Sequence, residues 1–178
     1  SSYTYPTTVD TYNDSLTKST ATSLGTGRSQ LAATTVGNYA LFGGGFQYSS
    51  NRYSIVDTYT SSLTKSTATS LSTARDNLAA TTVGNYALFG GGGSSSGWSS
   101  SVDTYTSSLT KSTATSLSQA RFDLAATTVG NYALFGGGDI SSSPYVTSTV
   151  DAYNSSLSRS TATSLSTARD NLAATTVG

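Results

Sequence analysis

The chain has 178 residues, with 9 basic and 9 acidic side chains and a formal net charge of zero. Every acidic residue is Asp, and the chain contains no Cys, His or Met. This composition excludes disulfides, metal sites made of thiolates or imidazoles, and catalytic groups that depend on His or Cys. Without a basic run we expect no nucleic-acid binding. No apolar stretch approaches the roughly 18 residues that a membrane span requires, so no membrane insertion is expected.

One sequence unit recurs four times, and the segment LAATTVG marks each copy at Leu31, Leu78, Leu124 and Leu172. The spacings are 46 to 48 residues, with repeat boundaries near residues 28, 75, 121 and 169. Repeats of this length indicate propeller blades, helical arrays or large solenoid units. Residues 1–178 are therefore predicted to form a single repeat domain or a fragment of a larger one.

Within a repeat, taken in chain order at the second complete copy, the sequence predicts four short strands. Residues 78–83 are small, apolar and β-branched, and a Gly-Asn turn connects them to residues 86–89. After a run of glycines and a variable loop, residues 102–105 alternate with period two, and residues 109–117 form a polar outer strand. No helical periodicity is present. The pattern predicts an all-β fold, a propeller of four-stranded antiparallel blades in preference to a sandwich.

The run ARDNLAATTVGNYALFGGG, followed after a loop by SVDTYTSSLT, resembles a kelch repeat. It has the arginine, the small-residue strand, the glycine turn, the aromatic-aliphatic strand that ends in glycines, and the spaced tyrosine. The resemblance covers essentially the whole chain and is strongest to Ser/Thr-rich kelch-like repeats of bacterial and prophage surface proteins. It departs from the family where the kelch tryptophan is missing, near Leu16, Leu63, Leu109 and Leu157.

This resemblance implies a place outside the cell, on a cell surface or on a virion. Galactose oxidase shares the kelch propeller, but its copper site needs His ligands and a Cys-linked Tyr. The chain has neither residue type, so we expect no enzyme activity and no cofactor. Asp139 with Asp14 or Asp123 lacks the clustered spacing of a calcium loop, and no metal site is predicted.

The repeat register predicts three complete blades and a fourth that is split between the two ends. Residues 8–12 correspond to a third strand and residues 172–177 to a first strand, and the split blade lacks its NYALFGGG strand. Unpaired strand edges favour association. We therefore expect either a fragment of a larger propeller or a homo-oligomer in which another chain supplies the missing pairing.

Sequence variation between the copies is concentrated in the loops after the glycines and in the residues after each arginine. In an antiparallel blade both positions are expected on one face of the disc, where a rigid scaffold presents a recognition surface. Alternatively, these loops vary only because nothing restrains them. The candidate ligand-binding residues in this region, with Trp98 as a candidate sugar-stacking platform, are Tyr48, Arg52, Tyr53, Trp98, Phe122 and Tyr145.

One arginine and one aspartate recur at constant spacing in every repeat. The arginines could form a basic collar that binds a carboxylate or phosphate, or each could form an ion pair with an aspartate between blades, which the constant spacing favours. The arginines are Arg28, Arg75, Arg121 and Arg169, and the aspartates are Asp10, Asp57, Asp103 and Asp151. The repeated tyrosines are predicted to pack with a bonded hydroxyl; they are Tyr12, Tyr59, Tyr105 and Tyr153, and also Tyr39, Tyr86 and Tyr132.

The sequence thus predicts a non-catalytic binding module that presents variable loops to a glycan or protein ligand. The alternative is a structural, self-assembling repeat protein that closes or polymerises through its incomplete blade.

Overall fold

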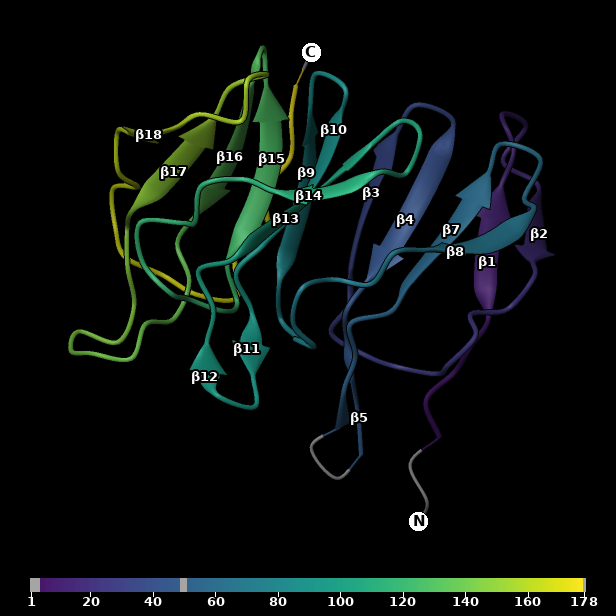
Figure 1. The fold of residues 1–178 in the computed structure, drawn as a ribbon, viewed down its shortest axis with the longest axis horizontal. Helices are drawn as coiled ribbons and strands as arrows, with labels where there is room; N and C mark the ends of the chain where they lie inside the picture. The colour runs from purple at the N-terminus through teal and green to yellow at the C-terminus, as the bar shows by residue number, and fades with distance from the viewer. Residues whose placement is uncertain (1–3, 49–50, 178) are drawn as a thin grey trace.

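The computed structural model describes residues 4–48 and 51–177 and contains only strands, turns and loops (Figure 1). Within these ranges, no helix is long and apolar enough to cross a membrane. Three four-stranded antiparallel sheets follow one another along the chain, which confirms the predicted blades. The first contains β3 (Ala32–Val36), β4 (Tyr39–Gly43), β7 (Val56–Thr60) and β8 (Lys65–Ala68). The second contains β9 (Ala79–Val83), β10 (Tyr86–Gly90), β13 (Val102–Thr106) and β14 (Lys111–Thr113).

The third sheet contains β15 (Ala125–Val129), β16 (Tyr132–Gly136), β17 (Val150–Tyr153) and β18 (Arg159–Ala162). A two-stranded sheet of β1 (Val9–Tyr12) and β2 (Lys18–Ala21) precedes the three blades. Two short hairpins interrupt the predicted loops: β5 (Phe46–Gln47) with β6 (Asn51–Arg52), and β11 (Gly93–Ser94) with β12 (Gly97–Trp98).

The first strands of successive blades lie next to one another, and threonine side chains connect them. The hydroxyl oxygens of Thr34 and Thr82 are 2.9 Å apart, as are those of Thr81 and Thr128. Thr127 makes the same contact with Thr176 at 2.8 Å, so residues 172–177 continue the row next to β15. Hydroxyl pairs of this kind satisfy polar groups that alternate along a strand with core residues.

Apolar side chains fill the two spaces between the complete blades. Leu41 and Phe89 belong to the first of these cores, and Leu88 and Phe135 belong to the second; all four are fully buried. A Cβ on Gly90 would lie only 2.7 Å from the Phe135 ring, and Gly43 has the same relation to Phe89. Gly43 and Gly90 are therefore required because the phenylalanine of the next blade packs on the backbone of each.

The invariant turns meet on the rim opposite to the variable loops. A Cβ on Gly37 would lie 2.8 Å from the Ser107 Cβ of the next blade, and one on Gly84 would lie 3.2 Å from the Ser155 Cβ. Turns of neighbouring blades are thus in direct contact, which explains why glycine and serine stand at the contacting positions.

The array of sheets is open. Among the described residues β1 pairs only with β2, and residues 172–177 form no ladder with β1. The two parts of the predicted split blade therefore do not combine into one sheet, and they lie at different places in the array (Figure 1). Without its second strand, the split blade has nothing to connect its inner strand to its outer pair.

Candidate functional site

The variable segments gather on one rim of the array, as predicted from strand direction. The hairpins β5–β6 and β11–β12 and the loop at 139–149 all project from the lower side in Figure 1. The variable segments that follow Arg28, Arg75 and Arg121 each pair with one of them, through the bridges Ser29–Phe46, Asp76–Gly93 and Phe122–Asp139. We call residues 29–30, 46–48, 51–54, 76–77, 94–101, 122–123 and 139–149 the variable rim.

Two aromatic side chains from different repeats stack on this rim. The ring centroids of Trp98 and Phe122 are 5.2 Å apart and the planes are inclined by 36°. Trp98 belongs to the β11–β12 hairpin, whereas Phe122 follows Arg121 at the entrance to the next blade. Both side chains are half-buried, so part of each ring remains accessible to a ligand.

The other predicted rim residues differ in how firmly they are held. Tyr53 donates its hydroxyl to Gln47 Oε1 at 2.6 Å, and Arg52 Nε lies 2.5 Å from Asp76 Oδ1. The Tyr53 bond closes the β5–β6 loop on itself, and the Arg52 pair holds the hairpin against the segment that enters the second blade. Tyr48 and Tyr145 are 60% and 62% exposed, so much of each side chain faces solvent.

A polar hollow lies where the first strands begin, a feature that sequence reasoning missed. Gln30, Asn77, Asp123 and Asn171 occupy equivalent positions, all with positive φ of 48° to 56°. Backbone hydrogen bonds of 2.9 to 3.0 Å connect them in a row. The N–H of Asn77 donates to the backbone oxygen of Gln30, the N–H of Asp123 to that of Asn77, and the N–H of Asn171 to that of Asp123. Together with the leucines that follow them, they line a hollow of about 260 Å³. The available signal was that these positions and the residues before them vary between repeats, while the leucines after them do not.

Asp123 gives this hollow an acidic character. Burial raises the pKa of its carboxyl above the ordinary value of 3.8, and the nearby Asp170, Asp139 and Asp76 raise it further. The rim therefore favours neutral or positively charged ligands over anions.

We expect Asp123→Asn to raise the melting temperature at neutral pH. A carboxyl whose pKa is raised by folding stabilises the fold at pH below 3.8, and this contribution is lost as the pH rises through the raised pKa. An amide carries no charge and tolerates positive φ, so it avoids that loss. Thermal unfolding against pH measures the effect, which should vanish well below pH 3.8. Asp14→Asn, at an exposed carboxylate in the turn between β1 and β2, is the control and should leave the curve unchanged.

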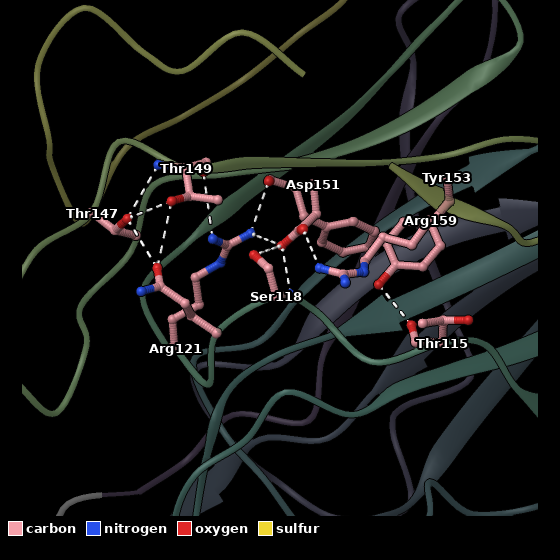
Figure 2. A network of polar contacts seen from close by, with 10 residues as sticks. Thr115, Ser118, Arg121, Thr147, Thr149, Asp151, Tyr153 and Arg159 are labelled. Carbon is pink, nitrogen blue, oxygen red and sulfur yellow. Dashed lines mark hydrogen bonds and ion pairs between the residues drawn. The ribbon is translucent and has the colours of Figure 1, made fainter. Parts of the chain in front are cut away.

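The repeated arginines form buried ion pairs with the repeated aspartates. Figure 2 shows the pair in the third blade, where an Arg121 nitrogen lies 2.7 Å from Asp151 Oδ2 and also donates to the Phe135 oxygen at 3.0 Å. Ser118 from the preceding connection donates its backbone N–H and its hydroxyl to the same carboxylate. Arg159 binds the other carboxylate oxygen at 2.9 Å. The aspartate thus joins its own blade to the segment that arrives from the previous one.

The structure confirms the ion pairs that the constant spacing favoured for Arg28, Arg75 and Arg121, so these three arginines do not form a basic collar open to a ligand. Their side chains are 4% exposed or less, and each guanidinium is bonded to an aspartate and to backbone oxygens. Burial lowers the pKa of Arg75 and Arg121, while the partner aspartates act in the opposite direction. The fourth pair does not form: Arg169 is exposed, and Asp10 pairs only with Lys18 among the described residues.

The repeated tyrosines, like the arginines, are buried in the complete blades and exposed at an open end of the array. Tyr59, Tyr105 and Tyr153 are buried and donate their hydroxyls to backbone oxygens of the preceding repeat, at 2.6 to 2.8 Å. Tyr12, predicted to pack in the same way, is instead 66% exposed because no sheet precedes it among the described residues. Tyr132 is also half-exposed, whereas its counterparts Tyr39 and Tyr86 lie against the apolar cores between blades.

Comparison with known proteins identifies the architecture. No protein-family model matches the chain, and no curated protein sequence matches it. Among solved structures, the structure of YjhT superposes with a TM-score of 0.73 and 11% sequence identity, covering 93% of this chain and 61% of YjhT. The chain therefore spans about three fifths of the length of that structure. Together with the three antiparallel sheets in series, this likeness shows a β-propeller-like all-β fold.

Proposed function

We propose that the chain is a non-catalytic recognition module that binds a glycan through its variable rim. The observation that carries the proposal is the stacked pair of Trp98 and Phe122, together with the polar hollow that is lined by Asp123, the residue after Phe122. Aromatic faces bind the apolar faces of sugar rings, and amide and carboxylate groups such as those of Asn77 and Asp123 bind hydroxyls. A protein ligand would use the same aromatic and small polar side chains.

Charge on the rim narrows the ligand class. The guanidinium groups of Arg28, Arg75 and Arg121 are buried in ion pairs, so they are not available to an anion. The carboxyl of Asp123 lines the hollow, and the carboxylates of Asp170, Asp139 and Asp76 lie near it. We therefore propose a neutral or amine-bearing glycan as the ligand. We also propose that the repeats are kelch-like, that the protein is extracellular or on a surface, and that it is not catalytic. The repeat pattern supports the first two points, and the lack of His and Cys supports the third.

The expected result is that a variant with Trp98→Ala and Tyr48→Ala loses binding by at least about tenfold on a glycan array, since each buried aromatic contact contributes more than 1 kcal/mol. Tyr132→Ala removes a half-exposed aromatic from the third blade and lies outside the rim, so it serves as the matched control. Undiminished binding by the rim variant, or equal losses in both, would contradict the proposed site.

Self-association through the open side of the array is a second candidate. Val129 is 50% exposed, whereas its counterparts Val36 and Val83 are buried between blades at 2% and 1%. An exposed apolar sheet face of this kind favours association. Size-exclusion chromatography with light scattering tests it: the proposal expects a mass above 18.2 kDa that rises with concentration, and a concentration-independent monomer contradicts it.

A further inference from the structure

The open side of the third blade is already shaped like the inter-blade surfaces of the other two. Leu165 N–H binds the Ser148 oxygen at 2.8 Å, as Leu117 N–H binds Ser100 at 2.8 Å in the preceding repeat. Gly138 N–H binds the Arg169 oxygen at 2.9 Å, the same distance as between Gly92 and Arg121. The segment after β18 therefore holds the position of a blade connection although no second strand pairs with it among the described residues.

A hollow of about 230 Å³ lies on this open side, with Gly136 and Leu134 on its floor and Arg169 and Leu172 on its wall. At the two complete interfaces the equivalent glycines, Gly43 and Gly90, are covered by a phenylalanine ring of the next blade. A Cβ on Gly136 would instead meet only Val150, at an ordinary 3.5 Å. The hollow therefore corresponds to the space that a phenylalanine ring of the next blade fills at the two complete interfaces.

Arg169 supplies a second recognition element. Its counterpart Arg75 donates to the backbone oxygens of Phe89 and Gly91 at 3.1 and 2.9 Å. These oxygens lie at the end of the second strand of the blade, so the arginine binds the backbone of its Phe-Gly-Gly segment. The exposed Arg169 donates only to Thr167, two residues away, among the described residues.

We propose that this side binds an extended strand with the repeat's own Tyr-Ala-Leu-Phe-Gly-Gly sequence, supplied by a further repeat of the same kind. The incoming strand pairs antiparallel with residues 173–177, as β10 pairs with β9. Its phenylalanine fills the hollow over Gly136, and its last backbone oxygens accept from Arg169. The inference is independent of the ligand-binding role of the variable rim. It rests on the same open side as the self-association proposal, but it names a strand as the occupant of that side instead of the apolar face of a second copy.

The test is the binding of a fluorescently labelled peptide, Gly-Asn-Tyr-Ala-Leu-Phe-Gly-Gly-Gly, followed by fluorescence anisotropy. We expect saturable binding with one peptide per chain, and a loss of at least about tenfold when the peptide phenylalanine is replaced by alanine. Gly136→Leu, which fills the hollow, and Arg169→Ala should each weaken binding of the original peptide. Tyr12→Ala, at the other open end, should leave it unchanged.

The proposal is overturned if the peptide does not bind, if its alanine version binds equally well, or if Tyr12→Ala abolishes binding and so places the strand at β1. The alanine peptide probes the unaltered protein, so the test stands even where Gly136→Leu impairs folding. Light scattering on the same samples separates the two proposals. A monomer that binds the peptide contradicts self-association and supports strand recognition. An oligomer that does not bind the peptide supports self-association and contradicts strand recognition.

Discussion

Replacing Asp103 with alanine is expected to lower the free energy of unfolding by about 3 to 5 kcal/mol, the usual cost of removing one member of a buried ion pair. The carboxylate accepts from Arg75 at 2.5 Å and from Ser72, and it is fully buried. Without it the Arg75 charge stays inside the protein with only backbone oxygens around it. Urea unfolding followed by circular dichroism measures the loss.

Asp10→Ala is the matched control, because the same residue of the repeat is exposed there. Its carboxylate pairs with Lys18 at 3.0 Å, and about half of each side chain is accessible to water. Such a surface pair contributes less than about 1 kcal/mol. Equal losses for the two variants would show that the buried pairs do not connect the blades.

Phe135→Ala is expected to cost about 3 to 5 kcal/mol, because it empties a fully buried position between the second and third blades. The ring lies over Gly90 and meets Tyr153 edge to face at 5.8 Å. Truncation leaves a cavity that the rigid sheets cannot close. The same urea titration measures the effect.

Phe42→Ala provides the comparison from the first blade. Phe42 keeps the edge contact with Tyr59 but is only half-buried, since the preceding sheet has two strands. Its loss should cost about 1 to 2 kcal/mol. If Phe42→Ala were as costly as Phe135→Ala, packing between complete blades would not be the main source of stability.

Most of the fold could be predicted because each repeat carries its own strand and turn signals. The Gly-Asn turns, the glycines at Gly43 and Gly90 and the period-two strands are local features, and their repetition fixed the register. Strand direction alone placed Trp98 and Phe122 on the same rim, and their stacking confirms it. The order of strands and turns along the chain was therefore sufficient to predict where the site lies, although it did not predict the contacts within it.

What could not be predicted depends on contacts between repeats. The β5–β6 and β11–β12 hairpins lie in polar loops without alternation, so no sequence signal marked them. Tyr12 and Arg169 carry the same sequence signals as their buried counterparts, yet both are exposed because their neighbouring blade surfaces are missing from the described residues. The row of backbone hydrogen bonds from Gln30 to Asn171 could not be predicted, because it depends on how the first strands of neighbouring blades lie around the hollow.

The most direct test of the variable rim as the ligand-binding surface uses Trp98, the single tryptophan of the chain. Its indole is the only one that can respond, and it lies against Phe122 on the rim. A neutral or amine-bearing glycan selected on the array should change the indole emission saturably, with the same midpoint as its binding measured by calorimetry. Full calorimetric binding with no change in Trp98 emission would place the ligand elsewhere on the molecule.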